Sequence, residues 1–233
     1  MSGLPVRNPG DSAVTRMASV LAGGMFRGAF PLKRRADLNV PLGCGMCVGR
    51  DVLDAHGWTA FSLSEDWEWY AILAARGVTI DYAPMAHLYA QEAKSLGQSG
   101  PQRQRWFAGK ITTLLRRGPE ILRSKAIGPR QKLDALGELS APGPAVHFGI
   151  AVALAVVLYS VQAPGRQILI ATLALSLIRP LGYALIGLAS DPQPLLALRA
   201  FAYLPLYTIW RLVAVTGALR MLGNKPWIRT ERH

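Results

Sequence analysis

The sequence predicts an α/β domain followed by an α-helical region that enters a membrane. Two observations support this fold class. The first part of the 233-residue chain mixes helical and strand-like patterns, whereas long apolar segments dominate the rest. The hydrophobic fraction of 51% is also high for a purely soluble protein. We therefore divide the chain into residues 1–135, the α/β part, and residues 136–233, which hold transmembrane or interfacial helices and a short basic tail.

Helices in the α/β part are predicted from apolar periodicity and from the residues that flank each pattern. A weak helical pattern covers residues 12–26. Residues 65–76 predict a second helix, because Ser64 suits the N-cap, acids fill the first turn and Gly77 can end it. Residues 102–117 form an amphipathic pattern that predicts a third helix.

Strands are expected between the second and third helices. Residues 78–82 alternate apolar and polar side chains, as a half-buried strand does, and Pro84 ends the pattern. A short second strand is expected at residues 86–90. These strands give the first part of the chain its predicted α/β character.

The membrane region contains three apolar segments, at residues 145–161, 168–189 and 195–219. A helix that spans a bilayer needs roughly 20 mainly apolar residues. The first two segments approach this length, so we expect spans at 145–162 and 167–189. The third is interrupted by Arg199, Pro205 and Arg211, and a charge at the bilayer centre costs at least ~2.5 kcal/mol. We expect it to be interfacial or tilted, so that the chain has two or three spans.

The net charge of +12 is concentrated in part, because nine of the 26 lysines and arginines lie between Arg103 and Lys132, just before the first apolar segment. Lysine and arginine beside a membrane helix favour the cytoplasmic side, where they meet anionic lipid headgroups. We therefore expect the first part of the chain to be cytosolic and attached to the inner membrane. The same position argues for membrane lipid, and against nucleic acid, as the partner of this cluster.

The two cysteines, Cys44 and Cys47, form a C-x-x-C pattern within a glycine-rich turn. This spacing suits a thioredoxin-type redox pair or half of a zinc site. However, the chain has no second C-x-x-C and no histidine pair at zinc-ligand spacing. The alternative, which we prefer, is a pair of small, buried, reduced thiols.

Two stretches carry residues that suit a sugar-binding site. Glu65 and Asp66 start the second predicted helix, and the neighbouring Trp67, Trp69 and Tyr70 are expected to form a partly dry wall of the site. Burial raises the pKa of a carboxylate towards values useful to a general base. Gln102, Arg105 and Trp106 offer an amide for hydroxyl groups, a guanidinium for phosphate and an indole for stacking. Taken alone, the two acids also fit a simple complement to the helix dipole.

The order of these motifs resembles the C-terminal half of family 2 glycosyltransferases, the membrane enzymes that include cellulose, chitin and hyaluronan synthases. The motifs are G-x-G-M, E-D and Q-x-x-R-W, followed by membrane helices. The similarity runs from Leu38 to Lys110 and resumes in residues 202–210 and 227–233 near the end of the chain. It implies a partial nucleotide-diphospho-sugar transferase domain of the GT-A type.

The resemblance implies a role for each motif. Asp66, beside Glu65, would be the general base that takes the proton from the acceptor hydroxyl in an inverting transfer. The acceptor and the diphosphate would be held by Gln102, Arg105 and Trp106. The glycine loop would let the backbone approach the acceptor through Gly43, Gly45 and Met46, although Cys44 within it departs from the usual asparagine. Ser64 stands where many relatives carry threonine.

The resemblance also implies a divalent cation, Mg²⁺ or Mn²⁺, held by a D-x-D motif. No two aspartates of this sequence stand two residues apart, so the motif is absent. We expect the donor-binding half to come from a missing N-terminal segment or from a partner subunit, and the truncated chain to turn over no substrate alone. The implied partners are a nucleotide-sugar donor and a polysaccharide or lipid-linked acceptor. Two alternatives remain: an inactive or accessory membrane protein, and a basic protein that binds the membrane surface.

Overall fold

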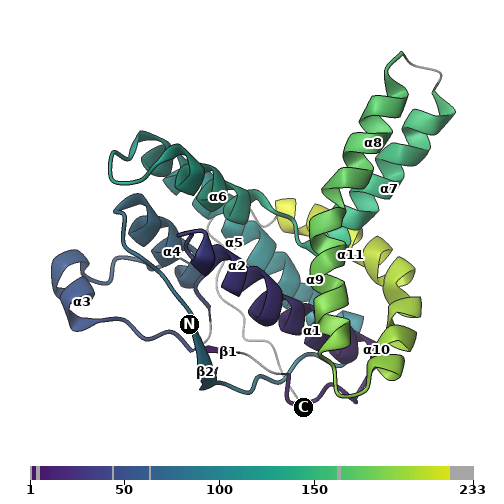
Figure 1. Ribbon diagram of the computed structural model, residues 1–233, viewed down its shortest axis with the longest axis horizontal. Helices are drawn as coiled ribbons and strands as arrows, with labels where there is room; N and C mark the ends of the chain where they lie inside the picture. Colours follow the sequence, from purple (N-terminus) through teal and green to yellow (C-terminus); the bar gives the residue numbers. More distant parts are fainter. Residues whose placement is uncertain (1, 4–5, 44, 63, 162–163, 221–233) are drawn as a thin grey trace.

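Helices make up most of the computed structural model, which describes residues 2–3, 6–43, 45–62, 64–161 and 164–220 (Figure 1). The α-helices are α1 (Ala13–Gly24), α2 (Phe30–Arg35), α3 (Arg50–His56), α4 (Glu65–Ala75), α5 (Leu96–Arg123), α6 (Pro129–Ser140), α7 (Pro144–Ser160), α8 (Arg166–Ser176), α9 (Ile178–Ala189), α10 (Pro194–Ala200) and α11 (Leu204–Leu219). A π-helical turn, η1 (Met25–Ala29), joins α1 to α2, and a 3₁₀ turn, η2 (Phe201–Tyr203), precedes α11.

Strands are scarce in these residues, so the predicted α/β sheet is not confirmed. The sheet found among the described residues has two strands, β1 (Ser2–Gly3) and β2 (Ala83–His87), which pair in parallel. Residues 78–82 are not a strand, although Val40 N donates to Ile80 O at 3.0 Å. The Asn39 side chain explains this difference, because it binds the backbone at Val78 and Ile80 and takes the place of a neighbouring strand.

The three helices predicted in the first part of the chain are confirmed. The pattern at 12–26 forms α1 and part of η1, and the pattern at 102–117 lies within the longer α5. The predicted caps of α4 are right in position: Ser64 is the N-cap residue, and Gly77 follows the helix with φ of 73°. Glycine suits this left-handed conformation because it has no Cβ.

The core of the first part forms where α4 packs against α5 and α6. Trp69 and Tyr70 of α4 are fully buried, and Ile121 of α5 and Leu139 of α6 share the same cluster. Burying a large apolar side chain contributes about 1.5–3 kcal/mol. This burial therefore fixes α4 in place and determines where its N-terminus lies.

The apolar segments form an exposed hairpin and a bundle at its base. Figure 1 shows α7 and α8 projecting from the body, with α9 continuing from α8 along α1. By length and composition, the helix Arg166–Ala189 is the one in the described residues that could cross a membrane unaided. Helices α6 and α7 pass the same test only as a pair, with a bend of 86° between them. The two spans at 145–162 and 167–189 therefore remain predictions.

The third apolar segment is broken into α10, η2 and α11, which agrees with its predicted interruption at Pro205. Arg179, which falls within the second predicted span, reaches back to α6: its Nη2 lies 3.5 Å from Glu138 Oε1. The tail predicted to resume the family similarity, residues 227–233, lies outside the described residues.

Candidate active site

The N-terminus of α4 lies directly against the middle of α5. Gly109 of α5 makes this contact possible, since a Cβ at this position would overlap the Ser64 side chain. Ser64 is buried and its hydroxyl has no hydrogen-bond partner among the described residues. Asp66 stands two residues beyond Ser64, while Arg105 and Trp106 lie about one turn before Gly109. The fold therefore brings the two predicted stretches together.

Asp66 is half-buried at this contact, and its pKa is raised. The largest cause is burial, which disfavours the charged carboxylate. The Trp67 amide, which donates to Asp66 Oδ1 at 2.8 Å, acts in the opposite direction. The neighbouring charge of Glu65 raises the pKa further, and that of Arg105 lowers it. The pKa of Asp66 is thus raised mainly by burial, with a smaller opposing effect of Arg105, and Glu65, which is exposed, acts on Asp66 through its charge.

The Q-x-x-R-W residues lie on α5 and differ in exposure. Gln102 is buried, Arg105 is half-buried, and Trp106 is 37% exposed. The Arg103 guanidinium lies 4.9 Å from the centre of the Trp106 ring and is held there by an ion pair to Glu92 at 3.2 Å. Trp106 is therefore an indole fixed by a cation–π contact, with surface left for a ligand.

The predicted aromatic surroundings of Asp66 are only partly right. Trp69 and Tyr70 turn into the core and are fully buried, so they cannot contact a sugar. Trp67 does stay at the site. Its ring lies 4.4 Å from Lys110 Nζ, and the same nitrogen donates to Ala141 O at 2.9 Å.

Lys110 is a site residue that the sequence analysis missed as a functional group. Burial lowers the pKa of Lys110 to about 8, against a smaller opposite effect of Glu138. The sequence spacing could have indicated Lys110, because it stands four residues after Trp106 and residues i and i+4 share a helix face. Lys110 links Trp67 beside Asp66 to the bend between α6 and α7.

An ion pair behind the site was also missed. Arg117 of α5 binds Glu68 of α4 at 2.8 Å, and the Ser62 amide donates to the same carboxylate at 3.2 Å. Burial acts to raise the pKa of Glu68, but these hydrogen bonds outweigh it and hold the pKa below its usual value. Glu68 is therefore an ionised structural partner of Arg117 that clamps α4 to α5.

Among the described residues, the hydrogen bond of Asp66 goes to the Trp67 amide and not to the glycine loop. Gly45 has φ of 72°, which only glycine adopts readily, and Met46 packs against the core cluster. Gly43 precedes them, and Cys44 lies outside the described residues. The prediction of buried thiols is wrong for Cys47, which is exposed.

The divalent cation that the family resemblance implies would need several carboxylate or imidazole ligands close together. No group of three His, Cys, Asp or Glu side chains in the described ranges is placed to bind a metal ion. Near Asp66, Glu68 is already committed to Arg117. The residues present do not fit the cation, and we assign no chemical step to it.

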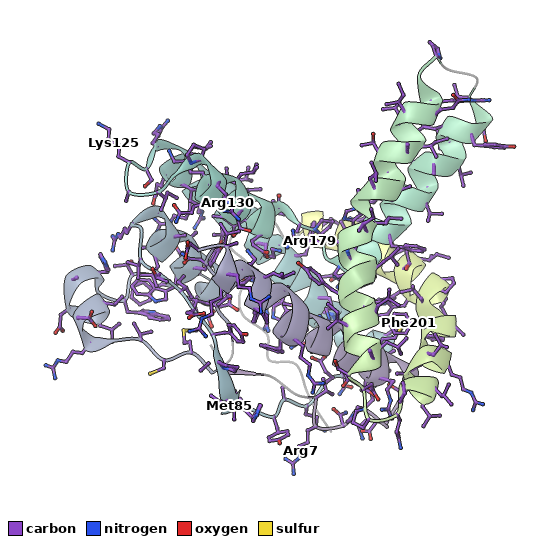
Figure 2. The ribbon with its side chains drawn as sticks, viewed as in Figure 1. Arg7, Met85, Lys125, Arg130, Arg179 and Phe201 are labelled. Atoms are coloured by element: carbon purple, nitrogen blue, oxygen red, sulfur yellow. The ribbon has the colours of Figure 1, made fainter. Side chains whose placement is uncertain are left out.

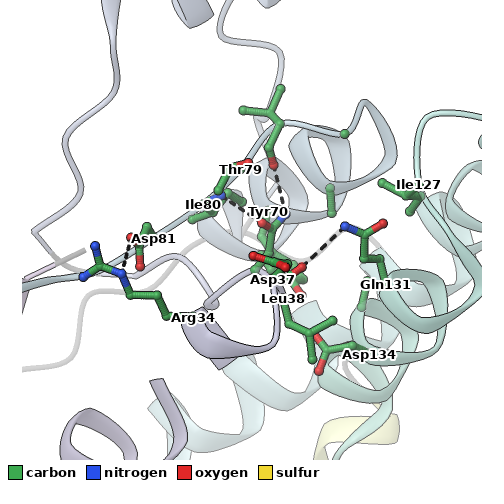
Figure 3. A pocket seen from close by; sticks show the side chains of 15 residues that line it. Arg34, Asp37, Leu38, Tyr70, Thr79, Ile80, Asp81, Ile127, Gln131 and Asp134 are labelled. Carbon is green, nitrogen blue, oxygen red and sulfur yellow. Dashed lines mark hydrogen bonds and ion pairs between the residues drawn. The ribbon is translucent and has the colours of Figure 1, made fainter. Parts of the chain in front are cut away.

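A cavity of about 310 Å³ with a mixed polar and apolar lining lies beside α4, between the segments 37–39 and 77–81 and α6 (Figure 3). Arg34 pairs with Asp81 at 3.1 Å beside it, and Gln131 donates to Asp37 O at 3.4 Å across it. Neither Asp66 nor the Q-x-x-R-W residues line this cavity. It is therefore separate from the candidate active site.

Comparison with protein families matches residues 27–220 to the model described as glycosyl transferase family group 2. Searches of curated proteins and of solved structures found no match. The matched range covers most of the chain and contains the α4–α5 contact as well as the helical hairpin. The chain belongs to glycosyl transferase family group 2.

Proposed function

We propose that the chain forms the acceptor side of an inverting glycosyltransferase that works at the cytoplasmic membrane, with Asp66 as the general base. The observation that supports this most strongly is the contact of Gly109 with Ser64, because it brings the start of α4, which carries the Asp66 carboxylate of raised pKa, against the part of α5 that carries Arg105 and Trp106. Membership of the family supports glycosyl transfer as the reaction.

In the proposed reaction, the Asp66 carboxylate accepts the proton of an acceptor hydroxyl as its oxygen bonds to the anomeric carbon of the donor. The bond from that carbon to the diphosphate breaks on the opposite face, so the configuration inverts. Such a base contributes roughly 10²–10⁴-fold to the rate. Arg105 would bind phosphate oxygens and Trp106 would stack on the acceptor sugar, with Gln102 supporting their helix.

The donor half of the site would be supplied by residues outside this sequence, because the D-x-D motif is absent from it. We propose a missing N-terminal segment or a partner subunit as the source. The motif order resembles that of polysaccharide synthases such as cellulose, chitin and hyaluronan synthases, so a growing polysaccharide or a lipid-linked sugar is the proposed acceptor. The glycine loop, with Gly43, Gly45 and Met46, would border it.

The test is sugar transfer by native membranes that contain the protein together with any donor-binding partner. A panel of labelled nucleotide sugars identifies the donor, and Asp66→Asn is compared with Asp54→Asn, an exposed carboxylate on α3. We expect Asp66→Asn to abolish most nucleotide release and Asp54→Asn to preserve it. If no donor is turned over in a way that depends on Asp66, the chain is an accessory protein and the proposal is wrong.

A further inference from the structure

An apolar groove of about 220 Å³ lies at the base of the α7–α8 hairpin. Its walls come from several helices: α1 (Met17, Leu21), α7 (Pro144, Phe148), α9 (Leu181, Leu185) and the α10–α11 region (Phe201, Tyr207). Almost no polar surface lines it. A water needs two to four polar partners to be held, and this lining offers almost none, so the groove suits a hydrocarbon rather than water.

The groove opens onto the apolar surface of the hairpin. Leu181 and Leu185 of α9 line it and are 50% and 64% exposed, and Phe148 of α7 lines the same groove. Figure 2 labels Phe201 on the same side of the body as α9. The exposed leucines, isoleucines and valines of α7 and α8 continue outward from this mouth. A lipid chain that lies along the hairpin could therefore enter the groove without crossing water.

A cation without an acidic partner lies at one end of the groove. Arg211 stands one turn after the groove residue Tyr207 on α11, and its Nη2 would lie 3.6 Å from a Cβ placed on Gly143, next to Pro144. Among the described residues no carboxylate lies within ion-pair distance of Arg211, and the ionisable groups that act on it are the Tyr207 hydroxyl and the Arg103 guanidinium. A half-buried arginine beside another cation favours an anionic ligand.

We propose that this groove binds one alkyl chain of a phosphate-bearing membrane lipid, with the lipid phosphate on Arg211. The apolar lining selects the chain, and the unpaired guanidinium selects the phosphate, so neither part alone should bind well. Arg103, which influences Arg211, also lies over the Trp106 ring. The lipid headgroup would thus lie on the side of α5 that carries the acceptor platform, although its binding does not depend on the proposed transfer.

The experiment is native mass spectrometry of the purified full chain in a neutral detergent. The probes are dioleoyl phosphatidic acid, dioleoylglycerol, which lacks the phosphate, and inorganic phosphate, which lacks the chains. We expect one phosphatidic acid to be retained, dioleoylglycerol to bind roughly 10-fold more weakly or worse, and millimolar phosphate not to displace the lipid. Equal binding of the two lipids would overturn the phosphate site, and displacement by phosphate would overturn the chain site.

Two variants with matched controls test the named residues. Arg211→Gln should weaken phosphatidic acid binding roughly 10-fold or more, whereas Arg130→Gln, an equal loss of charge on exposed α6, should not. Leu185→Glu in the groove should abolish binding, whereas Leu133→Glu, at a 75% exposed position on α6, should preserve it. If either test variant binds like its control, the site is wrong. The comparison of the two lipids on the unaltered protein decides the question even if a variant fails to fold.

Discussion

The substitution Gly109→Ala tests the helix contact that builds the candidate active site. An added Cβ would overlap the Ser64 hydroxyl and would also lie 2.5 Å from Ser64 Cβ. Rotation of the serine side chain can move the hydroxyl away, but it cannot move the Cβ. The backbone of α4 or α5 must therefore shift, and the distance between Asp66 and Arg105 must change with it.

The expected magnitude follows from this forced shift. Overfilling a packed interior usually costs about 1–3 kcal/mol of unfolding free energy. For a chain of this size, each kcal/mol lowers the melting temperature by roughly 2–4 °C, so Gly109→Ala should melt about 2–12 °C lower. Gly97→Ala is the matched control on the same helix, because no atom lies within 4 Å of its added Cβ. It should be neutral or stabilising by up to ~1 kcal/mol.

The assay is thermal unfolding of the purified protein in detergent, followed by tryptophan fluorescence or circular dichroism. Ser64→Gly removes both clashing atoms and loses no cap hydrogen bond, because Ser64 makes none. The double variant Ser64→Gly/Gly109→Ala should therefore recover most of the lost stability. The account of the contact fails if Gly109→Ala melts like Gly97→Ala, or if Ser64→Gly gives no recovery.

Three further predictions concern the site and the membrane region. The pKa of Lys110 is lowered from 10.5 to about 8, so between these pH values the folded protein binds fewer protons than the unfolded chain, and the free energy of unfolding should rise from pH 8 to pH 10.5. Lys110→Met should remove this rise in melting temperatures measured across the same pH range, and an unchanged slope would contradict the assignment. Trp106→Ala should raise the acceptor KM several-fold with little change in kcat through loss of stacking, and a pure kcat effect would argue against a platform. The protein should stay with membranes in high salt or carbonate and leave only with detergent, because salt does not weaken the burial of the apolar hairpin in the bilayer. Release by salt alone would contradict the spanning helices.

Local signals predicted the helices of this fold well. The bounds of α4 agree with the acids of the first turn and with Gly77, which act within a few residues; Ser64 occupies the predicted N-cap position, but its side chain makes no cap hydrogen bond. The strands could not be predicted in this way, because pairing depends on distant partners. Residues 78–82 have strand periodicity, yet the Asn39 side chain occupies the backbone groups that a strand would use.

The candidate site was predicted in part. The start of α4 and the middle of α5 do lie against each other, and Arg105 acts electrostatically on Asp66, whereas the roles of Asp66, Arg105 and Trp106 stay predictions. The orientation of the aromatic residues was not predictable, because α4 is apolar on nearly all sides and its periodicity does not identify an inner face. Trp69 and Tyr70 are therefore core residues, although their positions suggested a wall of the site. Lys110 carries its altered pKa only through burial, which no sequence pattern records.

The central claim is that Asp66 is the base of a sugar-transfer site, and the most direct test is its turnover number in the assembled enzyme. Asp66→Asn keeps the size and polarity of the side chain but cannot accept the proton. With the donor identified and saturating, we expect kcat to fall at least ~100-fold while donor binding persists. A kcat for Asp66→Asn close to that of the unaltered protein would contradict the account.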